Sequence, residues 1–214
     1  MPKLKSCLLI MGVTIVVAAE GFIQPKGGIA IPIKLNKDKA DRGSEKIAWN
    51  IGFEWGGIFD NRVGFGGSFD MYWQKTVYDS LLPDTSVQFD RYTIDREHKR
   101  FLFPLNAFFF IDPIPEVIVH PVIRGAFGPA MMIYVDKKYD DGSNDAEYTD
   151  PSGVYWGFTG RVGGDMHVNF GPESSIFFGF EYQWAALNRK EWRKNIYYHQ
   201  DMQGPVFRIG FRFI

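Results

Sequence analysis

Apolar and polar residues alternate in short runs along most of the chain. The clearest run lies nearest the C-terminus, where Phe207, Ile209, Phe211 and Phe213 alternate with Arg208, Gly210 and Arg212. Successive side chains of a β-strand point to opposite faces, so this run predicts a strand with one apolar face and one polar face. Four similar runs cover residues 49–55, 63–73, 156–168 and 176–184.

Three weaker runs complete the pattern, at residues 28–34, 100–111 and 119–133. They contain prolines at positions 32, 104, 121 and 129. Proline removes a donor from the hydrogen-bond ladder, so we expect bulges or local kinks in these three strands. The total is eight predicted strands, an even number.

The segments between the runs alternate in length. Long polar segments cover residues 35–45, 74–99, 135–153 and 185–204, whereas short turns lie at 59–61, 112–116 and 171–174. Short turns at one end and long loops at the other are typical of small membrane barrels. The sequence therefore predicts an all-β fold, an eight-stranded antiparallel up-and-down transmembrane β-barrel.

The first 19 residues have the three parts of a secretory signal. Lys3 and Lys5 precede an apolar run at 7–17, and small residues follow at 17–19. The run is shorter than the ~20 residues of a membrane-spanning helix, so we expect a signal peptide, residues 1–19, cleaved after Ala19. The alternative is an uncleaved anchor helix. Residues 20–214 form one predicted barrel domain.

Charge and cysteine content exclude several classes of function. The 24 Lys and Arg residues are balanced by 25 Asp and Glu residues, which leaves no basic field for nucleic acid. Cys7 is the one cysteine and would leave with the signal peptide, so disulfides, thiol catalysis and cysteine-based metal sites are not expected. We predict no metal and no cofactor.

The alternation alone does not say which face points into the barrel, and a soluble periplasmic barrel would have its apolar face inside. Two observations favour apolar side chains outside. Several Trp residues fall near predicted strand ends, where aromatic girdles meet the lipid interface. The polar face also carries balanced charges, which we predict to form an ion-pair network that plugs the lumen: Glu54, Asp70, Asp165 and Glu181 with Arg124, Arg161, Arg208 and Arg212.

The closing run 206–214, together with the sequences FPL at 103–105 and IRGAFGP at 123–129, carries a family resemblance. Over essentially all of residues 20–214 the chain resembles the small eight-stranded outer-membrane β-barrel proteins of Gram-negative-type bacteria, the OmpA/OmpX-like group and the porin-family barrel domain. The resemblance implies a monomer integral to the bacterial outer membrane, in contact with its lipid and lipopolysaccharide. It also implies that the barrel assembly machinery reads Phe207, Ile209, Phe211 and Phe213. One departure is that Ile214, rather than an aromatic residue, is last.

The segment 188–199 interleaves cationic and aromatic residues, and its candidate contacts for lipopolysaccharide phosphates or another anion are Arg189, Lys190, Trp192, Arg193 and Lys194. The alternatives are a solvated loop or an ion pair with the acidic loop 136–150. That acidic loop lacks the residue spacing of a calcium-binding loop.

An enzyme is the competing class. Ser68, Asp70, His120 and His167 lie on the predicted inward register, so a Ser/His/Asp arrangement is conceivable. The sequence has no nucleophile elbow, and we predict polar lumen residues and no catalytic residue. The predicted role is structural or surface interaction; the alternative is a lipid-modifying enzyme or a barrel that handles hydrophobic ligands.

Overall fold

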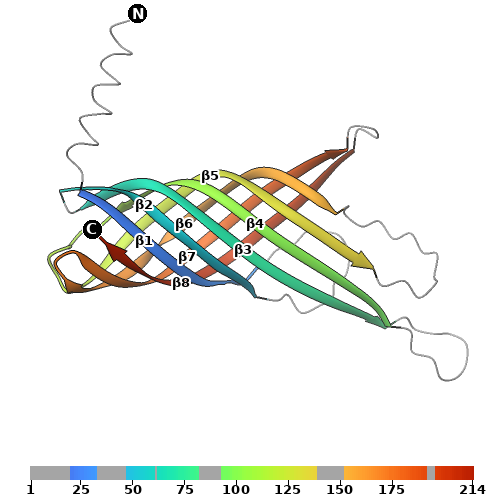
Figure 1. The fold of residues 1–214 in the computed structure, drawn as a ribbon, viewed down its shortest axis with the longest axis horizontal. Helices are drawn as coiled ribbons and strands as arrows, with labels where there is room; N and C mark the ends of the chain where they lie inside the picture. Colours follow the sequence, from blue (N-terminus) through green and yellow to red (C-terminus); the bar gives the residue numbers. More distant parts are fainter. Residues whose placement is uncertain (1–19, 33–46, 61, 82–92, 139–151, 192–195) are drawn as a thin grey trace, which may run out of the picture.

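The computed structural model describes residues 20–32, 47–60, 62–81, 93–138, 152–191 and 196–214, which form a closed barrel (Figure 1). Its strands are β1 (Glu20–Ala30), β2 (Ala48–Phe59), β3 (Val63–Leu81), β4 (Thr93–Ile111), β5 (Val119–Lys138), β6 (Gly153–Gly171), β7 (Ser174–Glu191) and β8 (Ile196–Phe213). Each strand is antiparallel to its neighbour in sequence, and β1 pairs with β8 to close the wall. The predicted fold class is confirmed.

The two ends of the barrel differ. At the turn end β1 begins, β8 ends and the short connections β2–β3, β4–β5 and β6–β7 lie. At the loop end β1 ends and β8 begins.

Several strands are longer than the alternation predicts. The segments 74–99 and 185–204, expected to be loops, largely continue the hairpins β3–β4 and β7–β8. Backbone ladder bonds need no apolar side chains, so the strands continue past the point where the apolar face ends. β1 begins eight residues before the predicted run. The alternation does not reveal this start, because apolar residues lie on both faces of the strand: Phe22 is buried while Ile23 is exposed.

The expectation of bulges at the prolines is wrong. The register of β5 with β6 remains in step from Val119 opposite Val168 to Tyr134 opposite Gly153, past Pro121 and Pro129. A proline φ near −65° is tolerated in a strongly twisted strand, and the lost donor need not shift the register. The irregularity that the described residues do contain lies between β6 and β7, at Asn169 to Gly171.

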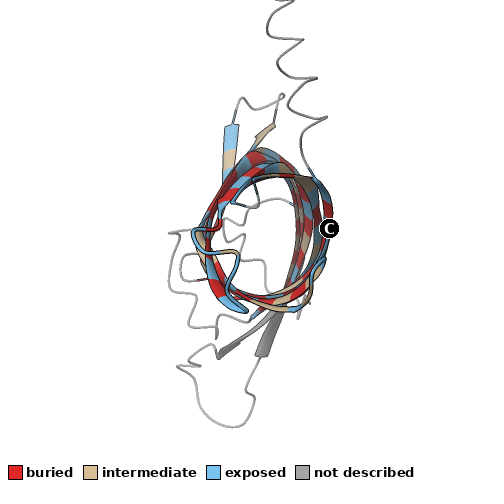
Figure 2. Ribbon diagram, turned by 90° about the vertical axis from the view of Figure 1, so that its left-hand side faces the viewer, coloured by how far each residue is buried: buried red, intermediate tan, exposed pale blue. Residues whose placement is uncertain are grey.

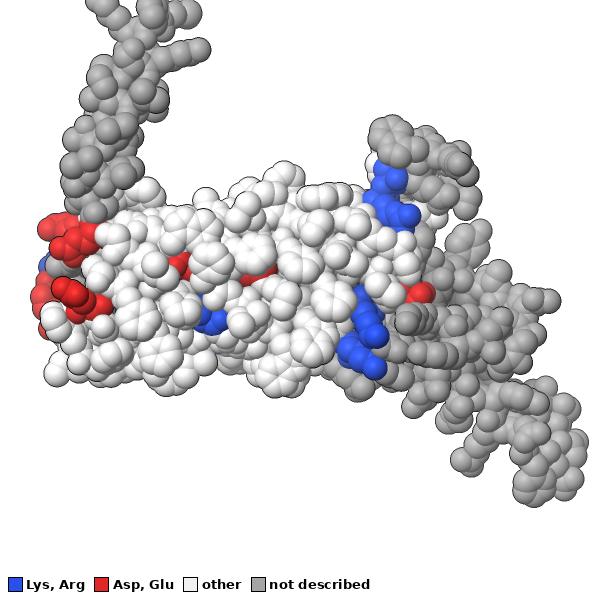
Figure 3. Space-filling model, in the orientation of Figure 1, with Lys and Arg blue, Asp and Glu red and all other residues white. Residues whose placement is uncertain are grey.

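Apolar side chains cover the outside of the wall. Buried and exposed residues alternate around the barrel (Figure 2), and charged residues are sparse on the side between its two ends (Figure 3). Trp49 and Trp156 are each 62% exposed, and Trp49 lies opposite Trp73. Trp55 and Trp184 are also exposed but lie within strands rather than near their ends, because the strands are longer than predicted. No helix formed by the described residues has the length and apolar character to cross a membrane.

The interior has three layers. A charged layer lies between two apolar clusters, and neither cluster follows from the alternation in the sequence. The cluster toward the loop end includes Tyr72, Leu102, Met132, Tyr155 and Leu187. The cluster toward the turn end consists of Phe22, Ile58, Phe108, Phe110, Val122 and Ala126. Inward residues such as Met132 sit between outward apolar neighbours, so the alternation does not reveal them.

Candidate functional site: the charged layer and the turn-end cavity

The charged layer contains four cations and four carboxylates, all buried, supplied by seven of the eight strands. They are Lys26 of β1, Glu54 of β2, Asp70 of β3, Arg124 of β5, Arg161 and Asp165 of β6, Glu181 of β7 and Arg208 of β8. Formal charges in this layer therefore sum to zero. Buried charges are tolerated when they are paired and hydrogen-bonded. Every member of this layer lies within ion-pair distance of an opposite charge, and every member except Glu181 is hydrogen-bonded.

Asp165 and Arg208 make the most complete pair. The Arg208 Nη2 atom lies 2.6 Å from Oδ1 and 2.7 Å from Oδ2 of Asp165, and Arg208 Nε donates to Oδ1 over 3.2 Å. Arg124 Nη1 donates to the same carboxylate over 3.1 Å. Contacts between a guanidinium fork and a carboxylate are among the strongest hydrogen bonds in proteins.

Glu54 and Asp70 share the amine of Lys26. Lys26 Nζ lies 2.5 Å from Glu54 Oε1 and 3.0 Å from Asp70 Oδ1. Glu54 also accepts a hydrogen bond from Arg124, and Arg161 Nη1 lies 2.9 Å from Asp70 Oδ2. Apart from the contact between Lys26 and Glu54, which lie on neighbouring strands, these contacts join strands that are not neighbours in the wall.

Glu181 approaches three guanidinium groups without hydrogen-bond geometry. Its carboxylate oxygens lie 2.7 Å from Arg124 Nε, 3.3 Å from Arg208 Nη2 and 3.8 Å from Arg161 Nη1. Neither oxygen has a hydrogen-bond partner. The attraction is therefore mainly between charges, and it is strong because the group is removed from water.

Glycines make room for the charged layer. Gly52 lies opposite Lys26 and Asp70, and Gly179 lies opposite Asp165 and Arg208. A Cβ atom on Gly179 would lie 2.1 Å from Asp165 Oδ1 and 2.6 Å from Arg208 Nε. Inward glycines beside several of the charged residues are thus part of how the sequence builds the layer.

The structure brings together seven of the eight residues predicted for the network and adds Lys26. Lys26 was missed because the predicted first strand began at residue 28. Arg212, the eighth residue, lies nearer the turn end. Its Nε donates to Gln24 Oε1 over 3.0 Å, and its guanidinium carbon lies 4.4 Å from the centre of the Phe110 ring. Within the described part of the chain, Arg212 has no carboxylate at ion-pair distance.

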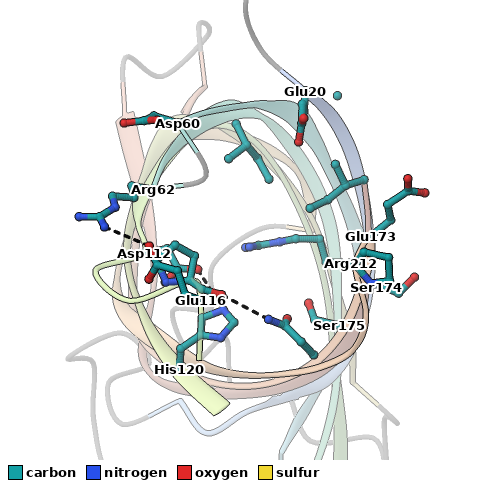
Figure 4. A pocket seen from close by; sticks show the side chains of 16 residues that line it. Glu20, Asp60, Arg62, Asp112, Glu116, His120, Glu173, Ser174, Ser175 and Arg212 are labelled. Carbon is teal, nitrogen blue, oxygen red and sulfur yellow. Dashed lines mark hydrogen bonds and ion pairs between the residues drawn. The ribbon is translucent and has the colours of Figure 1, made fainter. Parts of the chain in front are cut away.

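A cavity of about 840 Å³ occupies the turn end (Figure 4). Arg212, His120 and Ser175 project into it from different parts of the wall. His120 Nε2 lies 2.9 Å from Asp112 Oδ2. Burial raises the pKa of the Asp112 carboxyl, an effect that the nearby His120 and Arg212 oppose.

Acidic side chains surround the opening of this cavity. Glu20, Asp60, Glu116 and Glu173 line it and are exposed, and acidic residues gather at this end of the molecule in Figure 3. Arg62 Nη2 donates to Glu116 Oε1 over 3.0 Å. Hydrogen bonds from the Glu116 backbone and from Arg62 lower the pKa of Glu116.

The residues considered for catalysis do not assemble. Ser68 accepts a hydrogen bond from Arg161 Nη2 over 2.8 Å, and Asp70 is paired with Lys26 and Arg161. His167 Nδ1 is instead 3.0 Å from the Ser175 hydroxyl. Among the described residues, no group of three or more His, Cys, Asp or Glu side chains could hold a metal ion.

The proposed anion-contact residues are only partly described. Arg189 donates to the Ser152 carbonyl, and Lys190 Nζ lies 5.2 Å from the centre of the Tyr197 ring, in the β7–β8 hairpin at the loop end. Trp192, Arg193 and Lys194 lie outside the described residues. The four residues proposed as an assembly signal are on the outer face of β8, each 44–47% exposed: Phe207, Ile209, Phe211 and Phe213.

A closed eight-stranded antiparallel barrel with a charged layer inside and an apolar exterior has the fold of the small outer-membrane β-barrel proteins. Two solved structures illustrate the likeness. Ail, the attachment invasion locus protein of Yersinia pestis, solved in complex with the heparin analogue sucrose octasulfate, has a TM-score of 0.51 and 14% identity over 90% of this chain and 98% of its own. The outer membrane protein OprG from Pseudomonas aeruginosa has a TM-score of 0.51 and 15% identity over 92% of this chain and 96% of its own. By sequence, no family model and no curated protein matches.

Proposed function

We propose that this chain is an integral outer-membrane barrel with a closed lumen, and that it has a structural or surface-interaction role rather than acting as a channel. The observation that carries the proposal is the inversion of polarity across the wall. Ile123 is 60% exposed on the outside, whereas the next residue, Arg124, points inward and is almost wholly buried. An apolar exterior matches lipid, and a balanced charged interior matches a filled lumen.

The lumen is closed by side chains at two levels in this proposal. Arg124, Arg161 and Glu181 meet in the charged layer, and Tyr72 and Leu102 fill the layer toward the loop end. Eight strands enclose an interior that side chains can fill without leaving a pore. A structural or surface role follows, because a filled barrel offers its rims rather than its interior to other molecules.

Fractionation and gel mobility test the proposal. The protein should be recovered in the outer-membrane fraction and should migrate differently in detergent gels before and after heating. Purified protein in planar lipid bilayers should show no steady ion conductance. Recovery in the soluble periplasmic fraction without a heat-dependent shift, or a stable open-channel conductance, would contradict the proposal.

The surface that we propose to contact lipopolysaccharide lies on the β7–β8 hairpin. Arg189 and Lys190 are at the loop end, opposite to both termini of the barrel, and this end would face outward if the short turns face the periplasm. Neutralising Arg189, Lys190, Arg193 and Lys194 to Gln should weaken lipopolysaccharide binding. Arg62→Gln, at the turn end, is the matched control. Equal binding by both variants would contradict this contact.

A further inference from the structure

Arg212 is a buried cation that lacks a carboxylate partner. The residue is 5% exposed, and the charged layer already balances its four cations with four carboxylates without it. Its Nη2 atom has no hydrogen-bond partner. An unpaired buried charge is costly, so this position favours the arrival of an anion.

The surroundings of Arg212 hold its guanidinium in place. Nε donates to Gln24, and the rings of Phe110 and Phe22 lie 4.4 Å and 5.5 Å from the guanidinium carbon. Cation–π contacts and one hydrogen bond orient the group, but neither neutralises its charge. The guanidinium is therefore preorganised, which lowers the entropy lost when a ligand binds.

The cavity beside Arg212 supplies room and further polar groups. It measures about 840 Å³, within the size range of small-molecule sites. Ser175 and His120 line it together with Arg212. The Ser175 hydroxyl can donate to a carboxylate oxygen beside a guanidinium fork. Both ring nitrogens of His120 already have partners: Nδ1 lies 2.9 Å from the Val117 carbonyl oxygen and Nε2 lies 2.9 Å from Asp112 Oδ2.

The exposed acidic residues around the cavity opening form a rim, and Arg212 lies on the cavity floor. This acidic rim restricts which anions can reach the floor. Glu20, Asp60 and Glu173 are exposed around the opening, and within the described residues none of them has an ion pair. Their field repels simple anions and attracts cations. A molecule that carries both a carboxylate and positive charge is complementary to both parts of the cavity: its carboxylate can bind Arg212, and its cationic groups can face the acidic rim.

We infer that the turn-end cavity binds the carboxylate of a small molecule of net positive charge, with Arg212 as its anchor, Ser175 as a further donor, and the acidic rim facing the cationic groups. No covalent step is involved. The site is separate from the charged layer. Binding at this cavity therefore does not depend on whether the barrel conducts ions.

A matched set of probes distinguishes the contribution of Arg212 to binding from that of the acidic rim. Lysine carries a carboxylate and two amines, 1,5-diaminopentane is lysine without its carboxylate, and acetate is a carboxylate without an amine. The unfolding midpoint of the purified full barrel in detergent is measured with each probe at constant pH and ionic strength. At ten times its Kd, lysine should raise the midpoint of the wild-type protein by roughly 3–6 °C. Acetate should act only at much higher concentration, and 1,5-diaminopentane should have no effect.

Two variants of Arg212 and one control locate the effect. Arg212→Gln should abolish stabilisation by lysine. Arg212→Lys retains the charge without the planar fork and should weaken the apparent affinity at least tenfold, and it serves if Arg212→Gln does not refold. Lys75→Gln, which removes an exposed cation of β3 away from the turn end, should respond as the wild-type protein does.

Three results would overturn the inference. The first is no stabilisation of the wild-type protein by lysine. The second is equal stabilisation by lysine and 1,5-diaminopentane, which would mean that the acidic rim binds amines without Arg212. The third is an unchanged response to lysine in Arg212→Lys or Arg212→Gln. Equal potency of acetate and lysine would overturn the part assigned to the rim.

Discussion

Arg161 of β6 donates a hydrogen bond of 2.8 Å to the Ser68 hydroxyl of β3, across the lumen. Strands β4 and β5 separate these two strands in the wall. The bond therefore joins parts of the barrel that the backbone ladder does not connect directly. The charged layer acts as a set of internal braces as well as a filling.

Removing one member of the charged layer should destabilise the barrel strongly. Glu181→Ala leaves Arg124, Arg161 and Arg208 with an excess of positive charge. Arg161→Ala leaves an excess of negative charge, because Asp70 then has only the amine of Lys26, which it shares with Glu54. Loss of one partner of a buried ion pair costs about 3–5 kcal/mol. Urea unfolding followed by Trp fluorescence measures the loss. Glu20→Ala, on the exposed rim, should unfold at the wild-type midpoint, and wild-type stability in both network variants would rule out this role.

A methyl group on Gly179 should disturb the pair of Asp165 and Arg208. The added Cβ would lie 2.1 Å from an Asp165 carboxylate oxygen, so at least one charged side chain must move. Overpacking of this kind costs about 1–3 kcal/mol. Gly171→Ala is the control, because a Cβ there meets no atom within 4 Å. Equal unfolding midpoints for the two variants would show that the glycine is not needed for the close approach.

Two leucines of β4 lie on opposite faces of the wall, so their substitutions compare the inside of the barrel with its outside. Leu102 is fully buried in the cluster toward the loop end, whereas Leu105 is 52% exposed on the outer face. In detergent, Leu102→Ala should lower the free energy of unfolding by about 2–5 kcal/mol, because it leaves a cavity. Leu105→Ala should cost much less. Neither variant should conduct ions, because the charged layer remains complete; a similar loss of stability in both would argue against a packed interior.

Asp112 should make the barrel less stable as pH rises. Burial raises the pKa of this carboxyl, so the folded protein holds the proton more tightly than the unfolded chain does. The stabilisation is complete below the ordinary Asp pKa of about 4 and is lost as pH rises through the raised value. Asp112→Asn should flatten this part of the profile of stability against pH. Glu116→Gln should act in the opposite sense, since the pKa of Glu116 is lowered and its contribution is lost as pH falls. If Asp112→Asn leaves the pH dependence of stability unchanged, another group is responsible for that dependence.

The sequence predicts the barrel well because one physical signal repeats along it. The alternation in Phe207–Phe213 and its counterparts establishes strand faces, and the order of short and long connections establishes the topology. Inward-facing charged residues such as Glu54 and Arg124 could be expected to meet, because the interior of an eight-stranded barrel is narrow.

Other features depend on geometry that the alternation does not encode. Lys26 lies on a strand with apolar residues on both faces, so its inward position is hidden in the sequence. Arg212 shares a face with Arg208 but lies four residues closer to the turn end, beyond the reach of the network carboxylates. The inward glycines opposite charged residues were a usable signal: Gly179 is recognisable once the register of β6, β7 and β8 is known.

The charge balance of the interior also couples assembly to closure of the seam. Lys26 is in the first strand and Arg208 in the last, and both contact Glu54 of the second strand. Without β8 the layer would hold three cations against four carboxylates, and without β1 the deficit would be the same. Peeling either edge strand away thus breaks the backbone ladder and leaves a net negative charge inside the wall. Partly closed forms should be scarcely populated, and opening of the barrel should be an all-or-none event rather than a gradual fraying from the seam.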